Sequence, residues 1–173
     1  MVKGLARSIS RGDAQRAPIV RQTVKVRDLA ITVDGATGVG FGTAVAADLP
    51  AGNILLLGAV AYLAFTGPTS ASLDDDWAGD YGVGTTPASD ATLTGADIDI
   101  IGSTALAAAT AEVSPRTRGV GVTATNAAIL DNTDGSLEIN VSLLVDDANI
   151  GADGLAFTAD GEIFLSYVVL GDD

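Results

Sequence analysis

The sequence predicts an all-β protein: an antiparallel β-sandwich, jelly-roll-like in type, with an extended N-terminal arm. Composition is the first reason, because Ala, Gly and Thr supply 67 of the 173 residues, and 19 of the 22 acidic residues are Asp. Asp and Gly favour turns and Thr favours strands, whereas Glu and Lys would have favoured helices. The second reason is the repeated alternation of apolar and polar residues, in short segments separated by Gly- and Asp-rich turns.

The third observation is the uneven distribution of charge along the chain. The net charge is −13, but residues 1–27 hold seven of the nine basic residues and one acid, a local charge of +6. Residues 28–173 hold two basic and 21 acidic residues, a local charge of −19. We therefore divide the chain into an extended basic arm, residues 1–18, and a single β-sandwich body, residues 19–173.

Three strands are predicted in the first part of the body. Residues 23–33 alternate, with a change of phase near Asp28 that indicates a bulge, and the Asp-Gly pair that follows is a turn signal. Residues 38–47 form the second strand, and residues 53–66 form a third that is apolar enough to be buried on both faces. Its longest apolar run, Ile54–Phe65, has twelve residues and is too short to span a bilayer, so we expect no membrane partner.

The second part of the body begins with residues 67–95, which have few apolar anchors and predict a long acidic loop. A strand resumes at residues 98–101. Residues 104–113 fit either the one helix of the chain, ended by Ser-Pro, or a strand of small residues. The last predicted strands are residues 119–130, 136–145, a short segment at 155–158, and 161–170.

The sequence lacks the residue types of most catalytic sites. It has no His and no Cys, and its two lysines, Lys3 and Lys25, lie in or near the arm. Only carboxylate chemistry remains, and the acidic residues fall mostly in predicted turns. We expect no enzymatic activity and no cofactor.

A cluster of acids around Asp74, Asp75 and Asp76 raises the question of a calcium site. None of the acidic segments fits the EF-hand loop, and solvated turns favour the same residues, so we assign no metal ligands. A lectin-like sandwich, using Trp77 and Tyr81 near these acids with calcium as a bridge, remains an alternative function.

The basic arm is the best candidate for binding a partner. Nucleic acid is the general partner of such arms, but the acidic body would repel a polyanion beyond about 8–10 Å, so we expect no direct nucleic-acid contact. An acidic protein surface fits better. The residues predicted to bind it are Lys3, Arg7, Arg11, Arg16 and Arg21.

Three segments carry a resemblance to a known class of proteins: GNILLLGAVAYLAF at 52–65, DIDIIGSTALAAATAEVSPRTRG at 97–119 and ILDNTDGSLEINVSLLVDD at 129–147. They resemble small virion proteins of tailed bacteriophages. The resemblance implies a capsid cement, or decoration, protein of the auxiliary head class: a β-rich dimer or trimer on the outer capsid surface. Such a protein binds the major capsid protein and bridges neighbouring subunits. Another virion module, such as a head-fibre base or a tail-associated protein, is the alternative.

Overall fold

The computed structural model describes residues 19–36, 38–121, 129–147, 150 and 154–171. Within them the chain forms nine strands, all paired in antiparallel fashion, which confirms the predicted all-β class. A single 3₁₀ turn, Gly95–Ile98, interrupts them. The strands are β1 Val20–Ala36, β2 Val39–Asp48, β3 Gly52–Thr66, β4 Ala78–Gly84, β5 Ile101–Ala105, β6 Val113–Val120, β7 Ile129–Asn132, β8 Glu138–Asp146 and β9 Leu155–Gly171.

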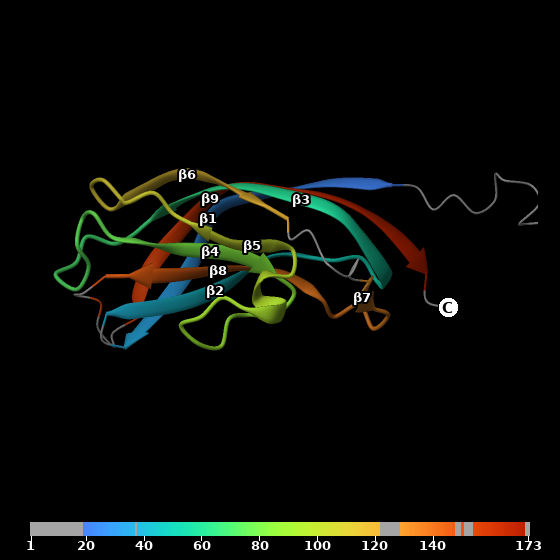
Figure 1. Ribbon diagram of the computed structural model, residues 1–173, viewed down its shortest axis with the longest axis horizontal. Coiled ribbons are helices and arrows are strands. Elements are labelled where there is room, and N and C mark those ends of the chain that lie inside the picture. The colour runs from blue at the N-terminus through green and yellow to red at the C-terminus, as the bar shows by residue number, and fades with distance from the viewer. Residues whose placement is uncertain (1–18, 37, 122–128, 148–149, 151–153, 172–173) are drawn as a thin grey trace, which may run out of the picture.

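The strand order is that of a jelly roll. One sheet has the order β1-β9-β3-β6 and the other β2-β8-β4-β5, and the two face each other in Figure 1. β7 is short and pairs only with β3. Among the other eight strands, β1 pairs with β9, β2 with β8, β3 with β6 and β4 with β5. This nested pairing is that of the two Greek keys of a jelly roll.

The two sheets nearly close into a barrel. They are joined on one side through β1 and β2, whose hairpin pairs Ala36 with Val39. On the other side β5 approaches β6 through an isolated bridge between Ile101 and Gly121. There the Tyr81 hydroxyl of β4 also donates a hydrogen bond to the Thr117 carbonyl of β6, at 3.2 Å. Local contacts therefore replace a continuous ladder at this edge.

The core lies between the sheets and is filled by the inward-facing residues of each strand. Phe65 packs on Tyr81 with ring centroids 5.5 Å apart, and Phe157 meets Trp77 edge-on at 5.1 Å. The first pair joins β3 to β4 across the sandwich, and the second joins β9 to the residue directly before β4. All four rings are buried, so aromatic contacts are part of the core near β4.

The predicted bulge near Asp28 is confirmed. The register of β1 against β9 shifts between Val26 and Leu29, and Asp28 has a positive φ of 46°. The turn expected at Asp34-Gly35 is wrong, because both residues pair within the β1–β2 hairpin and the chain reverses after them. Gly38, with φ of 89°, supplies the backbone conformation that the reversal requires.

The long acidic loop predicted for residues 67–95 is interrupted by a core strand. β4 pairs with both β8 and β5, and its Tyr81 and Val83 are fully buried. Its glycines hid it in the sequence, since they read as turn residues. In the structure a Cβ at Gly79 would overlap the Leu144 carbonyl of β8, so glycine allows the close approach of two strands.

The helix considered for residues 104–113 does not form. The chain is extended at the end of β5 and through a connecting segment, and it then reverses at Ala111 and Glu112, whose φ angles are 50° and 64°, before β6 begins at Val113. A continuous strand of small residues, the alternative, does not form either. The backbone N–H groups of Leu106 and Ala109 donate to the carbonyls of Gly79 and Trp77. These long-range bonds replace those that a helix would have made locally.

Replacing Trp77 with Ala should destabilise the body by about 3–5 kcal/mol, the usual cost of removing a fully buried large aromatic side chain. Trp77 is 2% exposed and its indole N–H donates to the Glu112 carbonyl at 3.1 Å. Denaturant unfolding measures the loss. The neighbouring exposed Asp76→Ala is the control and should change stability by less than about 0.5 kcal/mol. Equal effects would mean that this segment is not part of the core.

Stability should fall at alkaline pH through Tyr81. Burial is the main cause that raises the pKa of its hydroxyl from 10.0 to about 12, against hydrogen bonds to Gly119 and Thr104 that lower it. Because this pKa is higher in the folded protein than in the unfolded chain, the contribution of Tyr81 to the free energy of unfolding is complete below pH 10. That contribution is lost as the pH rises towards about 12. Tyr81→Phe should cost about 1 kcal/mol at neutral pH. It should also flatten the alkaline decline measured by denaturant unfolding, and parallel curves for the two proteins would contradict this account.

Candidate functional site

The outer face of the β1-β9-β3-β6 sheet is the candidate functional site, and β3 first draws attention to it. The sequence predicts that this strand is buried on both faces. The structure covers only the inner one: Leu63 and Phe65 are fully buried, whereas Tyr62 is 38% and Leu57 50% exposed. The expectation was wrong because, among the described residues, no second layer packs on the outer side of this sheet. An apolar surface therefore faces away from the protein.

Exposed apolar side chains gather on this sheet. Of the nine large hydrophobic residues that are exposed in the described part of the chain, eight lie on its strands, on β7 or directly before β1. The exception, Val45, belongs to β2 of the other sheet. The eight are Ile19, Leu57, Tyr62, Val113, Val120, Ile129, Phe164 and Leu170. Such a concentration on one face is typical of a surface that contacts another macromolecule.

The same face holds every cation of the described residues. All five are exposed, and they come from two strands at its opposite sides: Arg21, Lys25 and Arg27 from β1, and Arg116 and Arg118 from β6. Three carboxylates accompany them, Asp28, Asp160 and Glu162. The other fifteen described acidic residues lie at the margins of this sheet, in loops or on the other sheet. The body is therefore strongly polarised in charge.

Cross-strand register arranges these side chains in rows. One row runs Arg118, Tyr62, Glu162, Lys25, and the next runs Val120, Val60, Phe164, Thr23. The rings of Tyr62 and Phe164 meet edge-on with centroids 6.4 Å apart. We call these two rows the charged rows. The first row places the Tyr62 ring between Arg118 and Lys25, and Phe164 lies beside it in the second row, which has no charged member. Tyrosine and arginine are among the side chains most enriched where protein interfaces are strongest.

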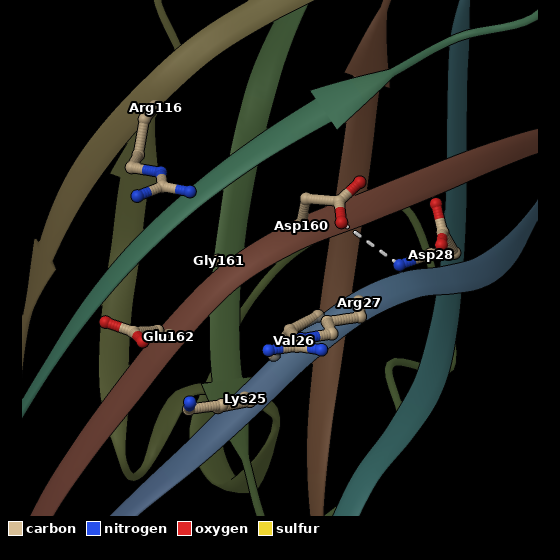
Figure 2. A pocket seen from close by; sticks show the side chains of 8 residues that line it. All are labelled: Lys25, Val26, Arg27, Asp28, Arg116, Asp160, Gly161 and Glu162. Atoms are coloured by element: carbon tan, nitrogen blue, oxygen red, sulfur yellow. Dashed lines mark hydrogen bonds between the residues drawn. The ribbon is translucent and has the colours of Figure 1, made fainter.

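A pocket of about 390 Å³ continues the charged rows at the bulge of β1. Figure 2 shows the Asp28 backbone N–H donating to Asp160, at 3.1 Å, while the Lys25 and Arg116 side chains lie on either side of Glu162. At the floor, Gly161 has φ of 150°, and a Cβ there would overlap the Tyr62 carbonyl. The residues that line the pocket are Lys25, Val26, Arg27, Asp28, Arg116, Asp160, Gly161 and Glu162.

Within the described part of the chain, no ion pair joins the five cations to these carboxylates. The guanidinium and ammonium groups therefore keep their hydrogen-bonding capacity for a partner. The pocket holds three cations and three carboxylates, so it matches a surface that carries both signs of charge more than it matches a polyanion. The whole face holds five cations against three carboxylates, which favours a partner surface with an excess of acid.

At the other end of the same face the surface is aliphatic. Leu55 of β3 pairs with Ile129 of β7 on one side and with Val168 of β9 on the other. Ile19 directly precedes Val20, which pairs with Tyr167, and so continues the line beside Val168. We call Ile129, Leu55, Val168 and Ile19 the aliphatic row; exposed Leu57 and Leu170 flank it. It carries no charge.

The predicted arm is only partly addressed by the structure. Lys3, Arg7, Arg11 and Arg16, like the whole of residues 1–18, lie outside the described residues. Arg21 does not belong with them, because it is an exposed residue of β1 paired with Ser166 of β9. Grouping it with the arm was wrong: in space it belongs to the same face as Arg118, which the sequence analysis did not select.

The aromatic platform of the lectin-like alternative is also contradicted. Trp77 and Tyr81 are 2% and 0% exposed and form part of the core, so neither can stack on a sugar. The nearby acids form a turn, in which Asp74 accepts a bond from the Trp77 N–H and donates its own N–H to Asp147. Among the described residues, no group of three or more acids is placed to hold a metal ion.

Comparison with known proteins yields no relative. No family model matches the chain, and no curated protein and no solved structure shows significant similarity to it. The described residues also include no helix that is both long and apolar enough to cross a bilayer. Function is therefore argued from the surface chemistry of this sheet together with the sequence resemblance.

Proposed function

We propose that this protein is a non-enzymatic virion structural protein that binds the outer surface of an assembled phage capsid and stabilises it by bridging neighbouring capsid subunits. Its partner is the major capsid protein. The observation that carries the proposal is the polarised body: the cations and nearly all the exposed apolar side chains of the described residues share one sheet face. The resemblance of the sequence to cement proteins supplies the identity of the partner.

The chemistry of the charged rows favours a protein partner. Tyr62 and Phe164 offer apolar area with little entropy to lose, while Lys25 and Arg118 at the ends of one row can pair with carboxylates across a contact. Interfaces gain affinity mainly from such anchored aromatic and arginine side chains. A nucleic acid is a poorer fit, because the fifteen acidic residues elsewhere on the described body would repel its phosphates.

The arm and the sheet face together give two points of attachment. Eighteen extended residues reach up to about 60 Å, enough to pass from one capsid subunit to the next. Two weak contacts linked in one chain bind more tightly than either alone. A protein that binds only where two assembled subunits meet stabilises the shell by that binding free energy.

Removing two cations from the charged rows should weaken capsid binding. Lys25→Ala with Arg118→Ala should raise the dissociation constant about tenfold or more, equivalent to about 1.4 kcal/mol, measured by co-sedimentation with purified capsids that lack this protein. The matched control adds two acids in the exposed loop after β4, Thr86→Glu with Ala91→Glu, which changes the net charge equally. Equal weakening by both would mean that overall charge, and not this face, governs binding.

Deleting residues 1–18 should abolish stable capsid binding and leave the body folded. All nine strands lie beyond residue 18, so the melting temperature should stay within about 2 °C of that of the full chain. Occupancy on capsids is measured by gel densitometry after sedimentation. Full occupancy by the truncated protein would refute the role of the arm, and binding confined to tails would move the proposal to the tail-associated alternative.

A further inference from the structure

The aliphatic row is a surface that the capsid proposal does not use. It lies at the end of the sheet where β3 begins, beside β7 and the start of β1 (Figure 1). Ile129 and Ile19, at the two ends of the row, are 56% and 61% exposed, and Leu57 and Leu170 beside it are about half exposed. Ile129, Leu57 and Leu170 stand on strands and Ile19 directly precedes one, so covering them costs little backbone order.

We propose that the aliphatic row binds the same row of a second copy of this chain, forming a two-fold symmetric, face-to-face dimer. The first argument is charge. Each chain has a net charge of −13, which opposes the approach of copies through most of their surface. The aliphatic row has no charged member, so two copies can meet here without bringing like charges into contact.

The second argument is the placement of Arg21 and Asp131, the two charged residues nearest to the row among those that the structure describes. Arg21 lies two residues after Ile19 along β1, and Asp131 lies two residues after Ile129 along β7. β7 is antiparallel to β3, whereas β1, paired to the antiparallel β9, runs in the direction of β3. The two exposed residues therefore occupy opposite corners of the aliphatic row, one beyond each end and on opposite sides.

Opposite charges at opposite corners make the surface self-complementary. In a two-fold contact, both copies contribute the same patch. When the two-fold axis lies in the plane of the contact and is perpendicular to the line from Arg21 to Asp131, Arg21 of each copy faces Asp131 of the other. Asp131 is already oriented, since its Oδ1 accepts bonds from the Thr133 N–H at 3.2 Å and hydroxyl at 2.9 Å. The pair of ion pairs would fix the register while the aliphatic side chains supply the affinity.

This arrangement leaves the charged rows free. The two-fold axis runs diagonally across the sheet, so the strands of the two copies cross. The part of each sheet that holds Lys25 and Arg118 therefore extends past the contact. A face-to-face contact over the charged rows is less favourable, because this part of the face has five cations and three carboxylates. Two copies would therefore bring two net positive surfaces together. The aliphatic row alone is smaller than the roughly 800 Å² per partner of a standard interface, so we expect micromolar affinity.

Sedimentation velocity of the full-length chain without capsids tests the dimer. The wild type should pass from monomer to dimer at micromolar concentration. Leu57→Asp with Ile129→Asp should remain monomeric up to at least a tenfold higher concentration. Val45→Asp, which alters the exposed apolar residue of the other sheet, is the matched control and should dimerise normally. A wild type that stays monomeric at several hundred micromolar, or a dimer indifferent to the double variant, would overturn the proposal.

Charge exchange tests the register. Arg21→Asp and Asp131→Arg should each weaken dimerisation, and the chain carrying both changes should recover it. Failure of the double exchange to recover, in a protein with an unchanged melting temperature, would contradict the arrangement. If the Asp131 change unfolds the turn, cysteine pairing replaces it, since the chain has no native Cys. A mixture of Arg21→Cys and Asp131→Cys chains should then form disulfide-linked heterodimers under mild oxidation, faster than either chain alone.

Other occupants of the row give different results. If residues 1–18 of the same chain cover it, the full chain is monomeric and the truncated chain dimerises, which would refute a second copy as the occupant. The test does not depend on the capsid proposal: Lys25→Ala with Arg118→Ala should weaken capsid binding and keep the dimer, so the two proposals can fail separately.

Discussion

The burial of only the inner face of the β1-β9-β3-β6 sheet, within the described residues, is the constraint on which the rest of this protein depends. Side chains alternate between the two faces of a strand, and in a two-layer sandwich only the inner faces meet. Phe65 and Phe157 on one sheet pack against Tyr81 of β4 and Trp77 directly before β4, and these contacts are part of the core. Residues around Ile98 cover part of the outer face of the other sheet, whereas no described segment covers the outer face of the β1-β9-β3-β6 sheet. The large apolar side chains on this uncovered face therefore call for a second explanation, and a binding surface is one.

Much of the fold is predictable because alternation is a local property. The segments 23–33, 136–145 and 161–170 carry regular alternation and are strands, and even the bulge at Asp28 is visible as a change of phase. β4 was missed because its glycines, which let it approach β8, read locally as turns. The course of residues 106–109 depends on hydrogen bonds to Gly79 and Trp77, which lie far away in sequence. Long-range pairing is what local patterns leave undetermined.

The binding surface was only half visible in the sequence, for the same reason. The apolar outer side of β3 was recognised, but a sequence does not distinguish a side covered by the protein's own second sheet from a side offered to a partner. The spacing of Lys25 with Arg27, and of Arg116 with Arg118, places each pair on a single strand. That these strands flank β9 and β3 on one sheet follows from the jelly-roll order. Position in sequence grouped Arg21 with the arm, whereas the sheet groups it with Arg118.

Charge and apolar area have separate roles on this face. The acidic remainder of the body opposes association in most orientations, and at moderate salt that repulsion fades beyond about 8–10 Å. Within that distance the local surface decides the outcome. Where cations outnumber carboxylates, around Tyr62 and Phe164, the face is chemically suited to a partner with an excess of acid. Where charge is absent, along the aliphatic row, two copies of an acidic chain can approach each other. Placing Arg21 and Asp131 at opposite corners then determines orientation without adding net charge, so one sheet face can hold two different contacts that do not compete.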